Sequence, residues 1–389
     1  MSSDLVVTPE ASRRLAAGAR DLPLALFGRR DLAGPARLTR PGGGWLALGL
    51  VDPDNGRLRV MAAAEEGFDE LGARFFAARV EKALALRRAL GLFESGQAFR
   101  LVHGAGDGLP GLSADRYGAF AVVHAYGPAL LDAARALASA LREQAGLEGV
   151  VLKLRARGAA ARGGPEQETL GREPPERLQV EELGVPFEVH LRSGLNTGLF
   201  TDMREQRHGL ARLARGRRVL NGFAYTGTLS VLAARGGAAE VASVDLSAGV
   251  LAWARDNLRA SGLDPADPRF AFESADVGRF LDHAAGAGRR FDLLLLDPPT
   301  FSAARGAGFA LERDYPQLVA RACAVVPPGG LLWLASNTRA VPLLDLVRQG
   351  LALARREAAL LSQAGLPPDH PTLPSQPEDR YLQALLLRI

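Results

Sequence analysis

The chain has 389 residues, which is too long for one ordinary domain, so we expect two or three. Hydrophobic residues make up 47% of it and charged residues 23%, a globular composition in which nothing suggests long disordered stretches. The formal net charge of +4 permits a polyanionic partner without requiring one.

Several kinds of site are predicted to be absent. The single cysteine, Cys323, excludes an intramolecular disulfide and a Cys-rich zinc site. The six His are scattered without the spacing of metal ligands, so we predict no metal. The N-terminal segment lacks the apolar stretch of a signal peptide, and no run of about 18 apolar residues is free of charges. We therefore expect a cytoplasmic protein without a membrane span.

Residues 1–68 are predicted to form a small β-rich domain. Two short apolar runs, 45–51 and 57–61, are separated by the turn 52–56, which contains an Asn-Gly pair. An Asn-Gly pair between two such runs is typical of a β-hairpin.

Residues 69–190 are predicted to form a mixed α+β domain. The spacing of apolar residues predicts a helix over 69–92. A hairpin is expected over 99–126, with a Gly-rich turn inside it, followed by a helix over 129–144 and a strand over 149–154. Residues 155–175 are rich in Gly, Arg, Pro and Glu and are predicted to be an exposed loop.

Residues 191–389 are predicted to form an α/β domain. Apolar runs alternate there with helix-length patterns: the runs lie at 218–221, 240–245, 270–274, 291–297 and 330–336. Continuous apolar strands between helices indicate a parallel sheet that is covered on both faces. Ligands of such sheets bind outside the carboxyl ends of the strands.

Polar residues follow the first three of these strands. The first strand leads into the Gly-containing turn 221–227, whose backbone N–H groups can hold a ligand at the start of a helix. The second ends at Asp245, which is placed to accept the hydroxyls of an adenosine ribose; alternatively, Asp245 or Ser247 caps the next helix. Asp276, after the third strand, either accepts the adenine amino group or is a helix cap.

The fourth strand ends in the run Asp297-Pro298-Pro299-Thr300-Phe301. Two successive prolines fix φ and remove two N–H donors. They predict a rigid bend that presents the Asp and the Phe ring beside unpaired carbonyl groups. This arrangement is suited to hold a planar base.

These segments resemble class I S-adenosylmethionine (SAM)-dependent nucleic-acid methyltransferases. Residues 297–301 are similar to motif IV of that class, 220–227 and 243–247 to motifs I and II, and 196–207 to the element before motif I. Residues 106–118 and 369–388 are similar to the bacterial large-subunit rRNA methyltransferases that carry an N-terminal PUA domain. The Pro-Trp-Val-Phe signature of that PUA domain is replaced here by residues 22–27, so we expect a degenerate PUA-like domain over 1–68.

The resemblance implies a fold, a cofactor and a set of site residues. The fold would be a C-terminal Rossmann-like methyltransferase sheet over 191–389, preceded by the PUA-like domain and the α+β middle domain. The cofactor would be SAM, bound by Phe200, Asp202, Arg204, Asn221, Phe223, Tyr225, Thr226, Gly227, Asp245, Leu246, Ser247, Asp276, Val277 and Asp297. The catalytic residues would be Asp297, Pro298, Pro299, Phe301 and Asn337.

The reaction depends on a missing cysteine. The 5-methylcytosine branch of the family uses a Cys thiolate just after the fifth strand, where this chain has Ser336-Asn337. Cys323 lies in an apolar helix and is predicted to be a buried structural thiol. The relative that makes N7-methylguanine in rRNA has a similar Asp-Pro-Pro-Thr-Phe-Ser run and a similar Ser-Asn segment. We therefore favour direct methyl transfer to a purine nitrogen of an unpaired base, guanine first and an amino nitrogen second.

Alternatives remain open at this point. Asp202 contacts the cofactor or caps the following helix, and Arg204 and Arg207 contact RNA phosphate or the cofactor carboxylate, or form a solvated face. The expected partner is RNA, 23S rRNA or a large-subunit precursor, and a homodimer is compatible with the sequence. Rival functions are 5-methylcytosine formation by a non-standard route, a catalytically silent SAM- and RNA-binding protein, and a small-molecule methyltransferase.

Overall fold

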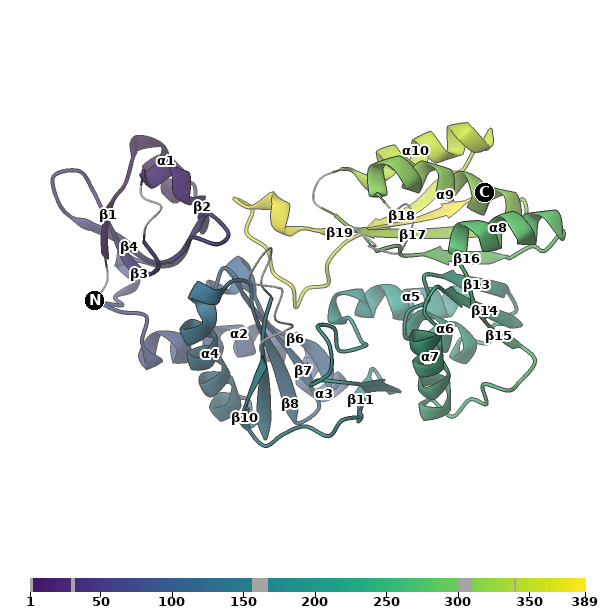
Figure 1. Cartoon of the computed structure of the whole chain (residues 1–389), viewed down its shortest axis with the longest axis horizontal. Helices are drawn as coiled ribbons and strands as arrows, with labels where there is room; N and C mark the ends of the chain where they lie inside the picture. The colour runs from purple at the N-terminus through teal and green to yellow at the C-terminus, as the bar shows by residue number, and fades with distance from the viewer. Residues whose placement is uncertain (1–2, 29–31, 156–166, 300–309, 339–340) are drawn as a thin grey trace. The chain divides into compact units, whose positions relative to one another are not determined.

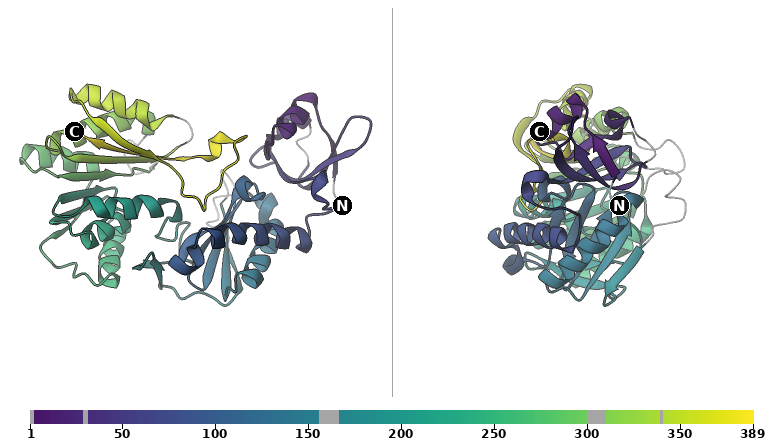
Figure 2. Two further views of the ribbon diagram at one scale, coloured as in Figure 1. Left: turned by 180° about the vertical axis from the view of Figure 1, so that it is seen from behind. Right: turned by 90° about the vertical axis from the view of Figure 1, so that its left-hand side faces the viewer.

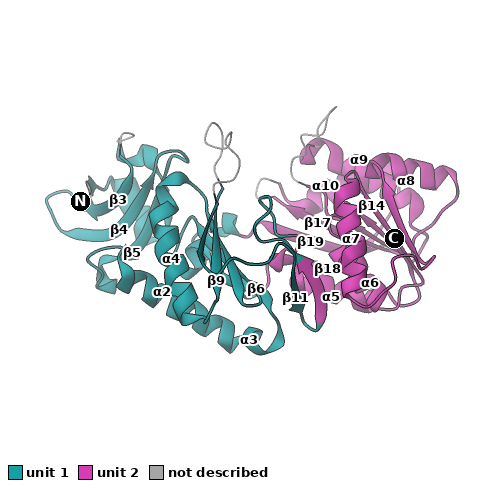
Figure 3. Cartoon of the chain, turned by 60° about the horizontal axis from the view of Figure 1, so that its bottom comes forward, with its two compact units in different colours: residues 1–184, 189–197, 368–379 teal, residues 185–188, 198–367, 380–389 magenta. Residues whose placement is uncertain are grey.

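A computed structural model describes residues 3–28, 32–155, 167–299, 310–338 and 341–389 (Figure 1). The chain divides into two compact units (Figure 3). Unit 1 comprises Met1–Gly184, Val189–Thr197 and Pro368–Asp379. Unit 2 comprises Val185–Glu188, Gly198–Pro367 and Arg380–Ile389. The sequence predicts three domains. The two compact units group the chain differently, because residues 1–68 and most of residues 69–190 lie together in unit 1.

The first sheet of unit 1 has the strand order β1-β3-β4-β5-β2. Its strands are β1 (Ser3–Val6), β2 (Asp21–Pro23), β3 (Gly34–Thr39), β4 (Trp45–Asp52) and β5 (Arg57–Ala63). The antiparallel pair β4–β5 confirms the hairpin predicted around the Asn-Gly turn. Helix α1 (Pro9–Ala16) was not predicted; the Thr8 side chain caps it by accepting a hydrogen bond from the Ala11 N–H at 3.2 Å.

The second sheet of unit 1 has the order β10-β9-β8-β7-β6. Its strands are β6 (Ala98–His103), β7 (Leu112–Tyr117), β8 (Phe120–Ala125), β9 (Gly149–Leu154) and β10 (Gln167–Gly171). Helices α2 (Ala73–Ala89) and α4 (Leu131–Gln144) pack on it and on each other (Figure 2). Further elements of the segment are α3 (Leu92–Ser95), β11 (Leu178–Glu182) and β12 (Val185–Val189).

Three expectations for this region need correction. The predicted single hairpin is a three-stranded meander, because residues 112–117 form β7 between β6 and β8. The predicted exposed loop contains β10, whose residues are largely exposed, so this edge strand carries no apolar alternation to reveal it. Helix α2 is shorter than predicted, since left-handed Gly91 (φ 68°) turns the chain just after it.

The first sheet of unit 1 has a hydrophobic core of its own around Leu22, Leu38 and Leu58, and it also contributes residues to the core of the second sheet. Leu48, Leu50 and Met61 of the first sheet lie in the same buried cluster as Phe75 and Phe76 of α2. Packing against a common core explains why the segment boundary expected near residue 68 is not a boundary between the compact units.

Unit 2 contains a seven-stranded sheet in the order β15-β14-β13-β16-β17-β19-β18. Its strands are β13 (Arg218–Gly222), β14 (Glu240–Asp245), β15 (Phe270–Ser274), β16 (Leu293–Leu296), β17 (Leu331–Asn337), β18 (Ala359–Ala364) and β19 (Leu382–Arg388). Strands β13 to β17 pair in parallel, whereas β19 is antiparallel to both neighbours. The parallel sheet predicted from the alternating runs is confirmed, and so is the Rossmann-like fold that the resemblance implies.

Helices cover both faces of this sheet, as expected for strands that are apolar throughout. Helices α5 (Arg204–Leu213), α6 (Thr228–Arg235) and α7 (Ala248–Ala260) lie on one face (Figure 1). Helices α8 (Val277–Gly286), α9 (Leu311–Val325) and α10 (Leu343–Ala354) lie on the other (Figure 1). All four residues of β16, Leu293–Leu296, are fully buried between them.

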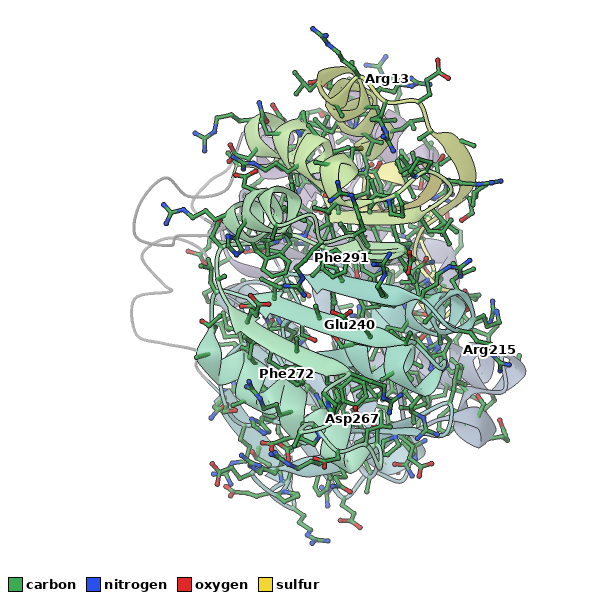
Figure 4. The ribbon with its side chains drawn as sticks, turned by 90° about the vertical axis from the view of Figure 1, so that its right-hand side faces the viewer. Arg13, Arg215, Glu240, Asp267, Phe272 and Phe291 are labelled. Atoms are coloured by element: carbon green, nitrogen blue, oxygen red, sulfur yellow. The ribbon has the colours of Figure 1, made fainter. Side chains whose placement is uncertain are left out.

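The amino and carboxyl ends of the strands of the unit 2 sheet differ in what they can bind. At the amino ends, Arg289 forms an ion pair with Glu240 at 3.5 Å and its guanidinium lies 5.3 Å from the ring centre of Phe291; Figure 4 labels both partners. At the carboxyl ends, the order of the strands reverses between β13 and β16, which are neighbours in the sheet. Connections leave in opposite directions from such a switch point and open a crevice there. The predicted site residues Asp245, Asp297 and Asn337 lie at this edge, at the ends of β14, β16 and β17.

Candidate functional site

The loop between β13 and α6 has an unusual backbone. Phe223 (φ 60°), Tyr225 (φ 49°) and Gly227 (φ 71°) all adopt left-handed conformations. For Phe and Tyr this conformation costs about 1–2 kcal/mol each, and such strain persists where the surroundings enforce it, typically at functional sites. Asn221, by contrast, turns its side chain inward and donates a hydrogen bond to Ser230 Oγ at 2.9 Å.

Asp245 holds this loop in place. One carboxylate oxygen accepts a hydrogen bond from the Tyr225 N–H at 3.0 Å, and the other accepts from the Ser247 N–H at 2.9 Å. Ser247 caps α7 through the Val250 N–H, so of the two capping candidates it is Ser247 that takes this role. The half-buried Asp245 and the exposed Leu246 therefore border the loop.

Asp276 and Val277 follow β15, the edge strand next to β14. Asp276 is exposed and caps α8, because its carboxylate accepts from the Arg279 N–H at 2.9 Å. The capping alternative for Asp276 is thus correct, although its second oxygen is left for other partners. Val277 is buried against Gly222, where an added Cβ would lie 2.9 Å from Val277 Cγ1.

The segment before α5 lies against the loop. Thr226 Oγ1 donates a hydrogen bond to the Gly198 carbonyl at 2.6 Å. The ring of Phe200, which is 44% exposed, lies 5.6 Å from the ring of Tyr225, measured between centroids. The element that resembles the pre-motif-I segment therefore contacts the predicted cofactor loop directly.

Two arginines of helix α5, Arg204 and Arg207, are buried. Arg204 is 5% exposed and Arg207 is 1% exposed, so the solvated-face alternative is wrong. Arg207 donates a hydrogen bond to the Phe200 carbonyl at 2.7 Å. Asp202 does not cap α5 either, since Met203 occupies the cap position.

Two carboxylates interact at the carboxyl end of β16. Burial, followed by the negative charge of Asp202, raises the pKa of Asp297 to about 7, while Arg207 opposes this shift. Burial and the charge of Asp297 raise the pKa of the Tyr315 hydroxyl on α9. The Tyr381 hydroxyl donates a hydrogen bond to Asp202 at 2.9 Å. The Asp297 carboxyl group therefore binds a proton more readily than an ordinary aspartate.

The remaining predicted catalytic residues differ in their exposure to solvent. Pro298 is buried, and Pro299 is exposed beside Asp297. Asn337 is exposed at the carboxyl end of β17, the strand next to β16. Phe301 lies outside the described residues. Cys323 of α9 is 3% exposed and belongs to the core, and burial raises the pKa of its thiol; the burial predicted for it is confirmed.

Three residues of the site escaped the sequence reasoning. Tyr381 reaches Asp202 from β19's amino end. Trp253 of α7 packs on Gly198, where an added Cβ would lie 2.2 Å from the Trp ring, and its indole N–H donates to the Glu188 carbonyl at 3.1 Å. Gly198 and Tyr381 lie within the two quoted similar segments, 196–207 and 369–388, which is the signal that could have found them.

Among the described residues, no cluster of three or more His, Cys, Asp or Glu is arranged to hold a metal ion. None of the helices in the described ranges combines the length and the hydropathy that crossing a bilayer requires.

Comparisons with known proteins identify the family of the chain. Residues 127–388 match the family of S-adenosylmethionine-dependent methyltransferases. A ribosomal RNA large subunit methyltransferase I from Erwinia tasmaniensis is 31% identical over 370 residues, covering 89% of this chain and 88% of that protein. A ribosomal RNA large subunit methyltransferase from Deinococcus radiodurans is 33% identical over 359 residues, covering 89% and 86%.

A solved structure from Streptococcus mutans, described as a SAM-dependent methyltransferase, is similar in fold. Its TM-score is 0.87 at 23% identity, and the similarity covers 100% of both chains. The family match spans the whole seven-stranded sheet, the loop 223–227 and both interacting carboxylates. The chain therefore belongs to the S-adenosylmethionine-dependent methyltransferases, and S-adenosylmethionine is its cofactor.

Proposed function

We propose that this chain methylates RNA of the large ribosomal subunit, 23S rRNA or its precursor, at a purine nitrogen, with guanine N7 as the favoured acceptor. The relatives named as ribosomal RNA large subunit methyltransferases cover most of the chain and support the substrate class. The choice of acceptor rests on the residue at the end of β17, where the 5-methylcytosine branch of the family has its Cys. An exposed Asn337 stands there, and the single Cys is buried in the core.

The loop and its neighbours fit the cofactor. The Asp245 carboxylate would hold the ribose hydroxyls, with Leu246 and Asp276 beside the adenine. Phe223, Tyr225, Thr226 and Gly227 would enclose the methionine part, and Phe200 would cover it. Buried Arg204 would face the cofactor carboxylate from α5, while Asn221 and Val277 would support the loop from below. The strained backbone of the loop, held by Asp245, supports this assignment.

Methyl transfer to guanine N7 needs little covalent chemistry from the protein. When bound, S-adenosylmethionine supplies an electrophilic methyl carbon on a sulfonium. The lone pair of N7 forms the new N–C bond, the pair of the C–S bond stays on sulfur, and no proton leaves the base. The residues then need only to position an unpaired base, with Asn337 bonded to its edge and the Pro298-Pro299 bend against its face.

Replacing Cys323 should separate this mechanism from a thiolate route. We expect Cys323→Ala to lose about 1 kcal/mol of unfolding free energy through the lost packing and to keep the full rate of methyl transfer. Asn337→Ala should lower kcat about a hundredfold, because it removes a group that contacts the base. Single-turnover rates of both variants, with thermal unfolding as the control, check this. An inactive but folded Cys323→Ala would contradict direct transfer.

The experiment that tests the proposed function is labelled-methyl transfer. Purified full-length chain and labelled S-adenosylmethionine are incubated with rRNA from cells that lack the gene, and nucleosides are then separated and weighed. Labelled 7-methylguanine supports the proposal. Labelled 5-methylcytosine would refute the choice of acceptor, and tight cofactor binding without label on any RNA would refute the substrate class.

A further inference from the structure

The amino ends of three neighbouring strands of the unit 2 sheet carry an excess of positive charge. The strands are β14, β13 and β16, and the segments around their starts are 235–240, 212–218 and 287–292. Together these segments contain two carboxylates, Glu240 and Asp292, and seven arginines: Arg212, Arg215, Arg217, Arg218, Arg235, Arg289 and Arg290. Because the whole chain has 47 Lys and Arg against 43 Asp and Glu, the rest of it has no net positive charge.

Backbone hydrogen bonds join the three segments into one surface. The Gly216 N–H donates to the Gly237 carbonyl at 2.8 Å, which links the segment before β13 to the segment before β14. The Asp292 N–H donates to the Arg218 carbonyl at 2.8 Å and links the segment before β16 to the same place. Arg215, which Figure 4 labels, is exposed next to Gly216. The positive charge is therefore gathered on one face, which we call the amino-end face.

Ion pairs neutralise only part of this charge. Asp292 pairs with Arg218 at 3.0 Å, and Glu240 pairs with Arg289 at 3.5 Å. These two carboxylates leave five of the seven arginines in excess. Among the residues that the structure describes, no carboxylate forms an ion pair with the other exposed arginines of the face: Arg212, Arg215, Arg235 and Arg290.

The helices that end at this face do not account for the excess either. Helices α5, α6 and α8 end there, and Arg212 and Arg235 lie in the last turns of the first two. The carbonyl groups at a helix C-terminus act as about half of one negative charge. Three helix ends therefore offset about 1.5 charges, which is less than the excess of five arginines. The amino-end face stays positive and can attract a polyanion.

The side chains of this face fit the phosphates of paired RNA. An arginine can donate two parallel hydrogen bonds to one phosphate. No large hydrophobic side chain of the three segments, all of which the structure describes, is exposed. A membrane-binding surface needs such side chains to enter the lipid, and a surface for single-stranded RNA needs aromatic rings on which bases stack. Double-stranded RNA is instead bound through its phosphates and 2′-hydroxyls.

We propose that the amino-end face binds the phosphate backbone of a double-helical segment of the substrate RNA. This inference rests on the proposed function and adds a second contact with the same RNA, whose unpaired base is methylated at the opposite end of the strands. Strand β13 has five residues, so the two ends lie about 17 Å apart at about 3.3 Å per residue. The arginines of the face therefore act on RNA binding and do not touch the reacting atoms.

Binding of an RNA duplex to the full-length chain tests the inference without methyl transfer. The probe is a labelled duplex of about 20 base pairs, slightly longer than the roughly 16 that a duplex-binding domain spans. Fluorescence anisotropy gives its Kd at several salt concentrations. The triple variant Arg212→Ala/Arg215→Ala/Arg290→Ala should weaken binding about tenfold or more. The slope of log Kd against log salt should fall by about 2 to 3, because each phosphate contact contributes nearly one.

A second triple variant, Arg279→Ala/Arg321→Ala/Arg348→Ala, is the matched control. It removes three exposed arginines from α8, α9 and α10 and changes the net charge by the same amount. Its affinity for the duplex and its salt slope should equal those of the wild type. Equal losses in the two variants would mean that only net charge matters and would overturn the inference. Unchanged binding in the first variant would overturn it too, as would wild-type binding to vesicles of anionic phospholipid but not to the duplex.

Steady-state kinetics with rRNA separate a binding role from a catalytic one. The first triple variant should raise the KM for rRNA about tenfold and keep the kcat of the wild type. A lower kcat with an unchanged KM would overturn the inference. Because duplex binding is measured without the cofactor, failure to label any RNA would refute only the proposed function. Failure of the wild type to bind the duplex, with rRNA still methylated, would refute only this inference.

Discussion

Gly198→Ala should weaken the binding of S-adenosylmethionine about a hundredfold and destabilise unit 2. An alanine Cβ at this position would lie 2.2 Å from the Trp253 ring, and the backbone has a φ of +95°. The left-handed conformation alone costs an alanine about 1–2 kcal/mol, and the clash adds about 1–3 kcal/mol. Relief of both requires Gly198 to shift, and its carbonyl accepts the hydrogen bond of the Thr226 hydroxyl. The loop 223–227 loses that anchor.

Gly209→Ala is the matched control for this change. Gly209 lies in α5, and an added Cβ there meets nothing within 4 Å. Alanine in a helix should stabilise the fold by about 0.5–1 kcal/mol and leave the cofactor affinity unchanged. Calorimetric titration with the cofactor and thermal unfolding measure both effects. Equal affinities in the two variants would mean that the Gly198 segment does not support the cofactor loop.

The sheet of unit 2 was predictable because burial on both faces leaves a simple pattern. Runs such as Leu293–Leu296 contain no polar residue until the strand ends. The first polar residues after the strands, Asp245 and Asp297, therefore mark the edge where a ligand binds. The exposed strand β10 has no buried face, and this is why its sequence looked like a loop.

Details of the site were not predictable for a different reason. The bond between Tyr381 and Asp202 joins residues 179 positions apart, and nothing local to either residue signals it. The left-handed conformations of Phe223 and Tyr225 were hidden because these residue types rarely adopt them. The surroundings impose these features, so only the folded chain displays them. The same applies to Arg204 and Arg207, whose burial contradicts the usual behaviour of helical arginines.

Asp297→Ala should lower kcat by about a hundredfold to a thousandfold, the range seen when a single preorganised hydrogen-bond group is removed from an active site. The structure gives three reasons. Asp297 ends the buried strand β16 at the switch point of the sheet, the bend Pro298-Pro299 fixes its backbone, and its carboxyl group has an environment that raises its pKa to about 7. Most of the loss should appear in kcat rather than in KM for the cofactor.

Asp292→Ala provides the matched control at the opposite end of the same strand. Asp292 forms an ion pair with Arg218 at 3.0 Å and also accepts from the Arg218 N–H at 2.9 Å. Its removal should cost about 1 kcal/mol of unfolding free energy and leave methyl transfer at the wild-type rate. Both variants remove one carboxylate from the vicinity of β16, so a difference in kcat reports the position of Asp297 rather than the stability of the strand. Equal rates in the two folded variants would exclude Asp297 from the reaction and leave Asn337 as the residue that positions the nucleobase.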